Sequence, residues 1–179
     1  MKISIIEKSQ VRIERYPLYE RVNKKIIEEC NQFNLVPYEQ TRLVSGSTSN
    51  VKALQTVDQI IRSPSLDKIY CWIMSLLQEN SNYQYLLQTA WVAKYNKGDY
   101  TVAHSHFPVT WSFVYCIKSP RGSSPLIFTT SGKRIKAEEG KVVIFPGSMK
   151  HHVPKNRCDG RIVLAGNVVP GQLLKDMNP

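Results

Sequence analysis

Residues 141–169 read KVVIFPGSMKHHVPKNRCDGRIVLAGNVV, and this stretch decides the fold. Two runs rich in valine and isoleucine, 141–145 and 161–169, flank the short run HHV, and Pro-Gly and Asp-Gly pairs lie between them. Branched apolar residues favour strands, whereas Pro-Gly and Asp-Gly pairs favour turns. The stretch therefore predicts three consecutive β-strands.

The same pattern extends toward the N-terminus in the runs WVAKY (91–95), WSFVYCIK (111–118) and PLIFTT (125–130). Together these runs make about six or seven strands at intervals of about 8–15 residues, a spacing typical of an antiparallel sandwich, barrel or jelly roll.

The first half of the chain has helical periodicity instead. Apolar residues recur at helical spacing in Tyr19–Phe33 and more strongly in Leu66–Gln78, where Ser65 is the expected N-cap. Between them, SGSTSN (45–50) is a small-residue loop that either lines a site or only connects elements. We predict an α+β fold in a single domain, 1–179, with a mainly helical N-terminal support in 1–85 and a jelly-roll catalytic core in 86–170.

The composition bounds the partners and the location of the protein. Lysine and arginine number 24 against 14 aspartate and glutamate, a net charge of +10, which favours acidic or nucleic-acid partners. The basic residues form no long run and accompany no nucleic-acid-binding motif, so we interpret them as a general positive field. Four scattered cysteines favour reduced thiols. No apolar run approaches the roughly 20 residues of a membrane span, and no secretory signal is recognisable. We expect a cytoplasmic protein.

The histidines are the most informative residues, because all four lie in the β-rich half as two tight pairs, His104 with His106 and His151 with His152. Residues two apart on a strand point to the same face, so His104 and His106 can reach one metal ion. Adjacent strand residues point opposite ways, so only one of His151 and His152 can join them. A lone His-x-His is more often a surface or packing feature, but two tight groups favour a metal site with positions open for substrates.

Arg161 follows His151 by ten residues, with the Asp159-Gly160 turn between them, which predicts adjacent antiparallel strands. Period-two alternation places Arg161 on one face with Val163 and Ala165. A guanidinium at the head of an apolar stripe needs a partner, and its planar fork binds a carboxylate through two parallel hydrogen bonds. We therefore expect a dianionic cosubstrate; the alternative is an ordinary solvent-exposed arginine at a strand end.

An ordered set of motifs covers about residues 88–169. It consists of Tyr95-Asn-Lys-Gly98-Asp-Tyr100-x3-His104-x-His106, Ser112-Phe-Val-Tyr115, Pro125-Leu126-x-Phe128, Gly140-Lys-Val-Val-Ile-Phe145-Pro146-x4-His151 and Arg161-Ile-x-Leu-Ala-x-Asn167. This set resembles the Fe(II)/2-oxoglutarate-dependent oxygenase superfamily, most closely its prolyl-4-hydroxylase-like group, which includes small oxygenases of bacteria and tailed bacteriophages. The resemblance implies a double-stranded β-helix (jelly-roll, cupin-like) core; if the protein is phage-encoded, it implies the host cytoplasm.

The resemblance also implies residue roles. His104 and His151 match iron ligands, and His106 occupies the place of the second ligand. The implied cosubstrate contacts are Arg161 on the far carboxylate of 2-oxoglutarate, with Tyr95, Leu126 and Cys116 around it, and the candidate pocket-wall residues are Asn167, Ser112 and Tyr100. No catalytic side chain is expected beyond the metal centre, which would use Fe(II), 2-oxoglutarate and O2.

Two positions depart from the family pattern. The second ligand is usually aspartate, and His106 in its place removes the negative charge of a ligand carboxylate. Cys116 stands where relatives often have a tyrosine hydroxyl. We expect His152 to face outward or to line the entrance.

The implied reaction is hydroxylation of a C–H bond with release of succinate and CO2. A protein or peptide is the expected substrate, with a prolyl or other peptidyl side chain as the target; the positive charge leaves nucleic acid open. One alternative is a cupin-type metal protein that does not use 2-oxoglutarate, although cupins normally add a glutamate soon after His-x-His and the stretch 107–111 has none. Another alternative is a non-catalytic β-sandwich binding module.

Overall fold

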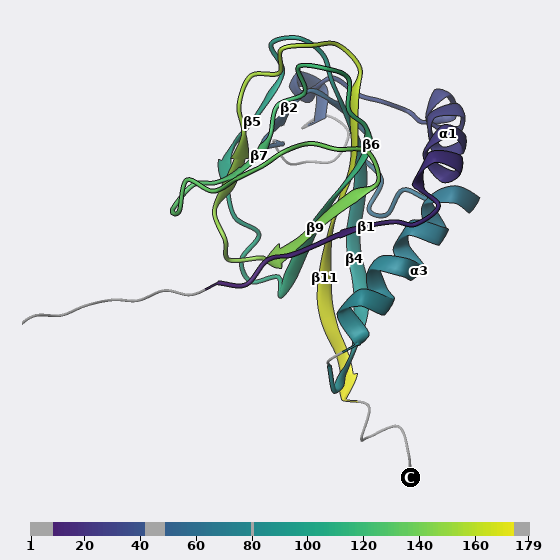
Figure 1. Cartoon of the computed structure of the whole chain (residues 1–179), viewed down its shortest axis with the longest axis vertical. Coiled ribbons are helices and arrows are strands. Elements are labelled where there is room, and N and C mark those ends of the chain that lie inside the picture. Colours follow the sequence, from purple (N-terminus) through teal and green to yellow (C-terminus); the bar gives the residue numbers. More distant parts are fainter. Residues whose placement is uncertain (1–8, 42–48, 80, 174–179) are drawn as a thin grey trace, which may run out of the picture.

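The structure is a computed structural model that describes residues 9–41, 49–79 and 81–173. Two antiparallel sheets form its body (Figure 1). The first sheet has, in spatial order, β1 (Arg12–Arg15), β9 (Lys141–Pro146), β6 (Trp111–Lys118), β11 (Arg161–Leu173), β4 (Tyr83–Tyr95) and β3 (Leu54–Gln55). The second has β2 (Val51–Lys52), β5 (Tyr100–His104), β10 (His151–Val153), β7 (Leu126–Phe128) and β8 (Arg134–Ile135).

This arrangement is a jelly roll, or double-stranded β-helix, and it confirms the predicted fold class. The runs at 111–118 and 141–145 became β6 and β9 almost without change. β4 and β11 are longer than predicted, because the two strands pair with each other from Arg161 opposite Tyr95 to Leu173 opposite Tyr83.

The helices begin and end close to the predicted positions. α1 (Tyr19–Glu29) continues as a 3-10 turn, η1 (Cys30–Gln32), and a second 3-10 turn, η2 (Tyr38–Gln40), follows. α3 (Pro64–Gln78) is capped by Ser63, whose Oγ accepts a hydrogen bond from the Leu66 amide at 3.2 Å. The prediction of Ser65 as N-cap is therefore wrong: Pro64 takes the first helical position, which suits its fixed φ and missing N–H, and Ser65 donates to Glu29 from inside the helix.

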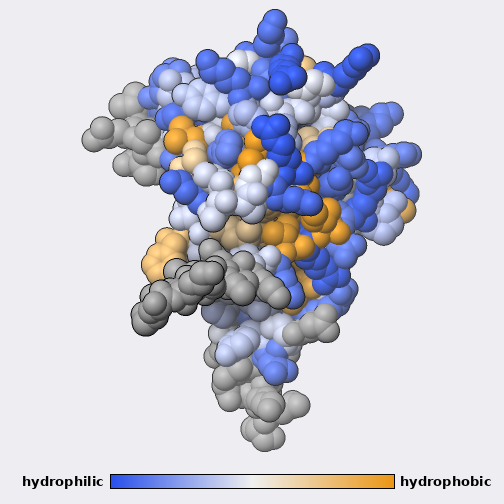
Figure 2. All heavy atoms as spheres, turned by 60° about the vertical axis from the view of Figure 1, so that its left-hand side comes forward, coloured by the Kyte–Doolittle hydropathy of each residue, from blue (hydrophilic) through white to orange (hydrophobic). Residues whose placement is uncertain are grey.

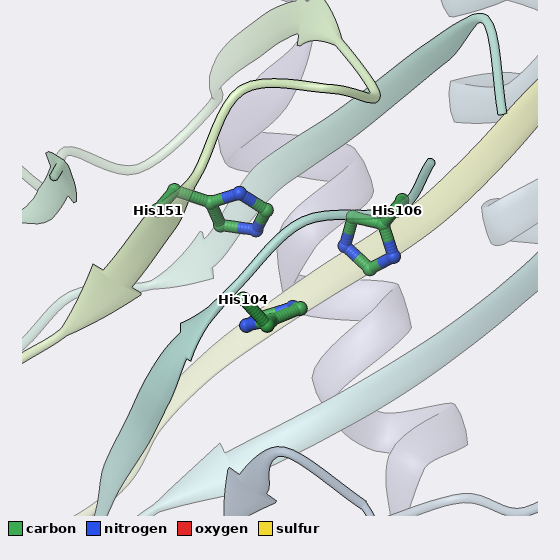
Figure 3. Close-up of side chains that lie close together, drawn as sticks. All are labelled: His104, His106 and His151. Carbon is green, nitrogen blue, oxygen red and sulfur yellow. The ribbon is translucent and has the colours of Figure 1, made fainter. Parts of the chain in front are cut away.

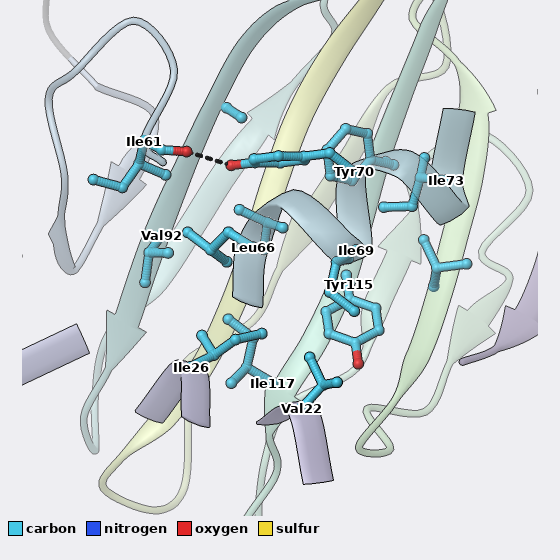
Figure 4. Packing of buried hydrophobic residues seen from close by; sticks show 14 of the residues in the cluster. Val22, Ile26, Ile61, Leu66, Ile69, Tyr70, Ile73, Val92, Tyr115 and Ile117 are labelled. Atoms are coloured by element: carbon cyan, nitrogen blue, oxygen red, sulfur yellow. Dashed lines mark hydrogen bonds between the residues drawn. The ribbon is translucent and has the colours of Figure 1, made fainter. Parts of the chain in front are cut away.

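Both helices pack on the outer face of the six-stranded sheet, away from the second sheet (Figure 1). Ile26 of α1 and Leu66, Ile69 and Ile73 of α3 are fully buried there (Figure 4), and each such side chain contributes about 1.5–3 kcal/mol relative to exposure. Tyr70 Oη donates to the Ile61 carbonyl at 2.7 Å, which satisfies the hydroxyl inside this core. The helices thus seal one face of the sheet and leave the other for a site.

The N-terminal half also contributes strands. β1, β2 and β3 are very short and add to both sheets, and β4 runs through residues 85 and 86 without a break. Of the small-residue loop at 45–50, residues 45–48 lie outside the described part of the chain.

All four cysteines are free, as predicted. Among the described residues no helix has both the length and the apolar character needed to cross a membrane. Hydrophilic side chains cover most of the face in Figure 2, with apolar ones gathered at its centre. The large apolar residues most exposed in the described ranges are Phe107, Leu18, Leu86, Tyr83, Ile13, Val102 and Tyr100.

Candidate metal centre

Three histidines converge between the two sheets. His104 ends β5, His151 begins β10, and these two residues are direct partners in the antiparallel ladder. With His106 they form a group in which the possible ligand nitrogens all lie within 4.8 Å of one another (Figure 3). This spacing would allow one metal ion to contact all three side chains, and the assignment of the three as ligands stays a prediction.

His106 reaches the group by a different route from the predicted one. β5 ends at His104, so His106 lies in the following turn and not on the same strand. Its backbone amide donates to the Gly147 carbonyl at 2.7 Å. A Cβ on Gly147 would collide with the Val109 carbonyl, so the glycine allows the two turns to come this close. The Pro-Gly turn before His151 therefore also positions His106.

Backbone carbonyls fix the tautomer of two of the rings. His104 Nδ1 lies 2.7 Å from the Val102 carbonyl oxygen, and His151 Nδ1 lies 2.9 Å from that of Met149. A carbonyl only accepts, so each Nδ1 carries the proton and each Nε2 keeps a free lone pair. This is the usual arrangement that orients a metal-binding histidine.

Burial keeps the three imidazoles neutral. It lowers the pKa of His106 to about 3, aided by His104 and His151 nearby, and lowers the pKa of His151 to about 4. Burial lowers the pKa of His104 as well, against its hydrogen bond to the Val102 carbonyl. Metal binding requires unprotonated nitrogen, so the triad is ready to bind a cation at neutral pH. No carboxylate joins this group among the described residues.

Arg161 is a buried cation without an anionic partner. It is 2% exposed and is the largest of the fully buried side chains. Its Nε and Nη1 have no hydrogen-bond partner, and no ion pair within the described ranges involves it. The guanidinium carbon lies 4.6 Å from the centre of the Tyr95 ring, a cation–π contact that offsets part of the cost of burial. Because a buried cation with two unpartnered donors is destabilising, we expect an anion to bind at Arg161.

A single pocket joins Arg161 to the triad. Both line it, with Tyr95, Leu126 and the Val163–Ala165 side of β11. Arg161 and Val163 therefore share a face, as alternation predicted. The prediction of adjacent strands for His151 and Arg161 is wrong: β10 pairs with β5 and β7, and β11 pairs with β4 and β6, so the two residues belong to opposite sheets. They meet across the pocket.

Comparison with solved structures identifies the fold. A viral collagen prolyl hydroxylase from Paramecium bursaria Chlorella virus-1, in complex with 2-oxoglutarate, matches with a TM-score of 0.70 at 16% identity, over 88% of this chain and 94% of that one. A Pseudomonas putida prolyl-4-hydroxylase matches with 0.65 at 15%, over 90% and 93%. HygX from Streptomyces hygroscopicus, with nickel, 2-oxoglutarate and hygromycin B bound, matches with 0.70 at 9%, over 90% and 83%.

The chain has the fold of the 2-oxoglutarate- and Fe(II)-dependent oxygenases. No protein-family model and no curated protein matches the sequence. At identities of 9–16% the likeness establishes the shared fold alone.

Within this oxygenase fold, Thr101 is a pocket residue that the sequence did not indicate. Its Oγ1 lies 2.7 Å from Tyr95 Oη, and both residues are buried. Strand alternation would place Thr101 and His104 on opposite faces, but the pairing of β5 with β10 is irregular there. His104 pairs with His151 and Thr101 pairs with Val153, so β5 covers three residues where β10 covers two. Such a bulge shifts the side-chain alternation by one residue. Tyr100 is therefore 38% exposed and lines no pocket with the triad.

The remaining predicted residues lie at the margins of this pocket. Cys116 is buried and lines an adjoining small cavity that shares Arg161 and Leu126 with this pocket, and its thiol lies 2.9 Å from Ser119 Oγ. Ser112 and Asn167 are hydrogen-bonded to each other at 2.9 Å and do not line the pocket. His152 points to the other side of β10, with Nδ1 3.1 Å from Thr129 Oγ1. Trp91, Phe145 and Val153, which do line the pocket, carry no signal in the sequence beyond strand propensity.

Proposed function

We propose that this chain is an Fe(II)- and 2-oxoglutarate-dependent dioxygenase that hydroxylates a C–H bond and releases succinate and CO2. The observation that carries the proposal is Arg161, a buried guanidinium with two unpartnered nitrogens in the same pocket as three convergent histidines. A cation-binding triad and an anion-binding arginine on one pocket suit a cosubstrate with an oxo-acid group at one end and a carboxylate at the other.

The residues present fit both groups. His104, His106 and His151 would hold Fe(II), which when bound supplies the activation of O2 for oxidative decarboxylation of 2-oxoglutarate. Arg161 would bind the far carboxylate through two N–H groups on one edge of its guanidinium, and the Tyr95 ring lies against the guanidinium, 4.6 Å from its carbon. The apolar walls around Leu126 exclude water, which strengthens the ionic contact.

The three-histidine set gives the site a particular electrostatic character. A carboxylate ligand would add a negative charge, and none is in the group. Three imidazoles would leave the full charge of a bound cation uncompensated by protein ligands, and the anionic end of 2-oxoglutarate would then supply the first negative charge at the site. We infer stronger coupling between metal and cosubstrate binding than a site with an aspartate would have.

For the substrate we propose a peptidyl side chain, with proline as the first to be tested. The viral and Pseudomonas neighbours are prolyl hydroxylases by name, and a Trichoplax adhaerens neighbour is a prolyl hydroxylase in complex with a peptide fragment of hypoxia-inducible factor. HygX was solved with hygromycin B, so one fold accommodates other substrates. The proposed prolyl substrate is therefore tested separately from the proposed use of 2-oxoglutarate.

The test is succinate formation by the purified chain supplied with Fe(II), 2-oxoglutarate and air. Slow turnover without added peptide is expected in the wild type and in His152→Ala, whose ring faces away from the pocket. His151→Ala should form no succinate above the level without protein. Succinate formation that is equal in His151→Ala and in wild type would refute the assignment, and its absence from all three would favour a cupin-type protein that does not use 2-oxoglutarate.

A further inference from the structure

A second hollow adjoins the metal centre. It is a groove of about 330 Å³, and it shares Val51, Trp91, His104 and His106 with the inner pocket. His151 and Arg161 line only the inner pocket. A molecule in the groove therefore reaches the triad without displacing an anion bound at Arg161. Under the proposed function, this is the place for the molecule that is oxidised.

The charge of the groove is opposite to that of the chain. The whole sequence carries +10, yet among the described residues that line the groove Asp58 is the only one with a charged side chain. Asp58 is exposed and makes no hydrogen bond or ion pair with the described part of the chain. Apart from a metal ion at the triad, a phosphate or carboxylate placed here would meet no cationic side chain among the described residues that line the groove, and one like charge would repel it. The described side chains of the groove therefore do not share the positive charge of the chain.

A buried relay fixes one hydrogen-bond donor in the groove. Ser112 Oγ donates to Asn167 Oδ1 at 2.9 Å, which sets the orientation of that amide. Asn167 Nδ2 must then face the other way, and it donates to Thr89 Oγ1 at 2.9 Å. Because the Thr89 oxygen accepts here and its proton has no acceptor in the described ranges, the hydroxyl is left to donate into the groove that Thr89 lines. Strands β6, β11 and β4 thus present a hydrogen-bond donor to the groove.

An aromatic face lies between the donor and the metal ligands. The Trp91 ring is 6.1 Å from the His106 ring, centre to centre, and it lines the groove together with Thr89 and Asp58. An indole face attracts cations as well as apolar groups. The groove thus offers a donor for a carbonyl oxygen, an aromatic surface and one carboxylate for a basic group.

We propose that this groove binds a basic peptide segment, with a peptide carbonyl accepting from Thr89 and a lysine or arginine side chain pairing with Asp58, and that it disfavours acidic segments and nucleic acid. The proposal rests on the proposed oxygenase function, because it takes the groove to be the substrate site. It explains what the buried Ser112–Asn167 pair does, although neither residue lines the pocket: both are positioning residues for Thr89.

The probes are three fluorescein-labelled nonapeptide libraries, rich in lysine, in glutamate or in uncharged polar residues, and a labelled single-stranded DNA 12-mer. Binding is measured by anisotropy at physiological salt with Mn(II) and 2-oxoglutarate present. The lysine library should bind most tightly. Asp58→Asn should weaken lysine-library binding by roughly three- to fivefold, as expected for an exposed ion pair, whereas the matched control Glu20→Gln, an exposed carboxylate on α1, should not. Thr89→Val should weaken all three libraries, and Thr89→Ser should restore them.

Tighter binding of the glutamate library or of the DNA than of the lysine library would overturn the proposal. Equal effects of Asp58→Asn and Glu20→Gln would overturn it as well, because they would reveal a response to net charge alone. Titrations of Mn(II) and 2-oxoglutarate into the same wild-type protein distinguish failure of the oxygenase proposal from failure of the groove proposal. Failure to bind either one refutes the oxygenase function. Normal binding of both without preference among the libraries refutes only the proposed specificity of the groove.

Discussion

Replacing Arg161 by methionine distinguishes the effect of the buried cation on folding stability from its effect on 2-oxoglutarate binding. The side chain is 2% exposed, and Nε and Nη1 are unpartnered. A buried hydrogen-bond donor without a partner destabilises the folded protein by about 1–3 kcal/mol. A desolvated cation–π contact such as the one with Tyr95 stabilises it by about 2 kcal/mol. These contributions oppose each other. With two unpartnered donors the cost is about 2–6 kcal/mol, so Arg161→Met, which keeps a long side chain, should leave the free energy of unfolding of the cosubstrate-free protein unchanged or raise it by up to about 4 kcal/mol.

Affinity for 2-oxoglutarate should respond far more strongly. Charge-assisted hydrogen bonds contribute about 1.5–3 kcal/mol each, and one edge of the Arg161 guanidinium can offer two such donors to a carboxylate. The loss of both corresponds to an increase in Kd on the order of 10²- to 10⁴-fold, at about 1.4 kcal/mol per tenfold. Arg161→Lys should lose less, since it keeps the charge but not the fork.

Calorimetry of 2-oxoglutarate binding to the Mn(II)-loaded protein measures this difference. Arg121→Met is the matched control, because it removes an equal charge from an exposed arginine. Mn(II) affinity without cosubstrate should be similar in all variants. If Arg161→Met bound 2-oxoglutarate as tightly as Arg121→Met, the anion at this pocket would be something else, and the reasoning from the unpartnered nitrogens would be wrong.

Three further predictions concern the histidines. His104→Ala should abolish Mn(II) binding in calorimetry, and His152→Ala should leave it intact; equal affinity in the two would remove the triad as the metal site. His106→Asp should retain the metal and His106→Ala should lose most succinate formation, so a fully active His106→Ala would mean that another group completes the site. Burial holds the pKa of His106 near 3 and that of His151 near 4, so below about pH 6.5 the unfolded chain binds protons that the folded, metal-free protein does not. Stability to denaturant should therefore fall as the pH is lowered from 7 to 5, by about 2 kcal/mol per histidine, and an unchanged midpoint in wild type would contradict these shifts.

The sequence predicted the elements whose pattern repeats over many residues. β6 and β9 are uninterrupted apolar runs between turns, and α3 has a strong helical period, so each was recognisable. β2 and β3 have two residues each, too few for any periodicity, and only their pairing with β5 and β4 makes them strands. The helix start moved to Ser63 because the sequence offered two serines around Pro64 and local pattern alone did not separate them.

The site was predictable where it depended on residue type and less so where it depended on topology. The clustering of histidines and the lone arginine in an apolar stripe indicated His104, His151 and Arg161. The prediction that His151 and Arg161 lie on adjacent strands failed because the chain crosses to the other sheet after Val153. Ten residues are enough either for a hairpin within one sheet or for this crossing. Thr101 was missed because the irregular pairing in β5 changes which side chain faces inward, and a bulge leaves no mark in this sequence.

The most direct measurement of the central claim is the fate of oxygen from ¹⁸O2. The protein is loaded with Fe(II) and 2-oxoglutarate without air, exposed to ¹⁸O2, and the succinate is analysed by mass spectrometry. A 2-oxoglutarate-dependent dioxygenase places one oxygen atom of O2 in succinate, so we expect a single ¹⁸O atom in the succinate formed, and none when His151→Ala replaces the wild type. Intact 2-oxoglutarate, or succinate without ¹⁸O, would contradict the account.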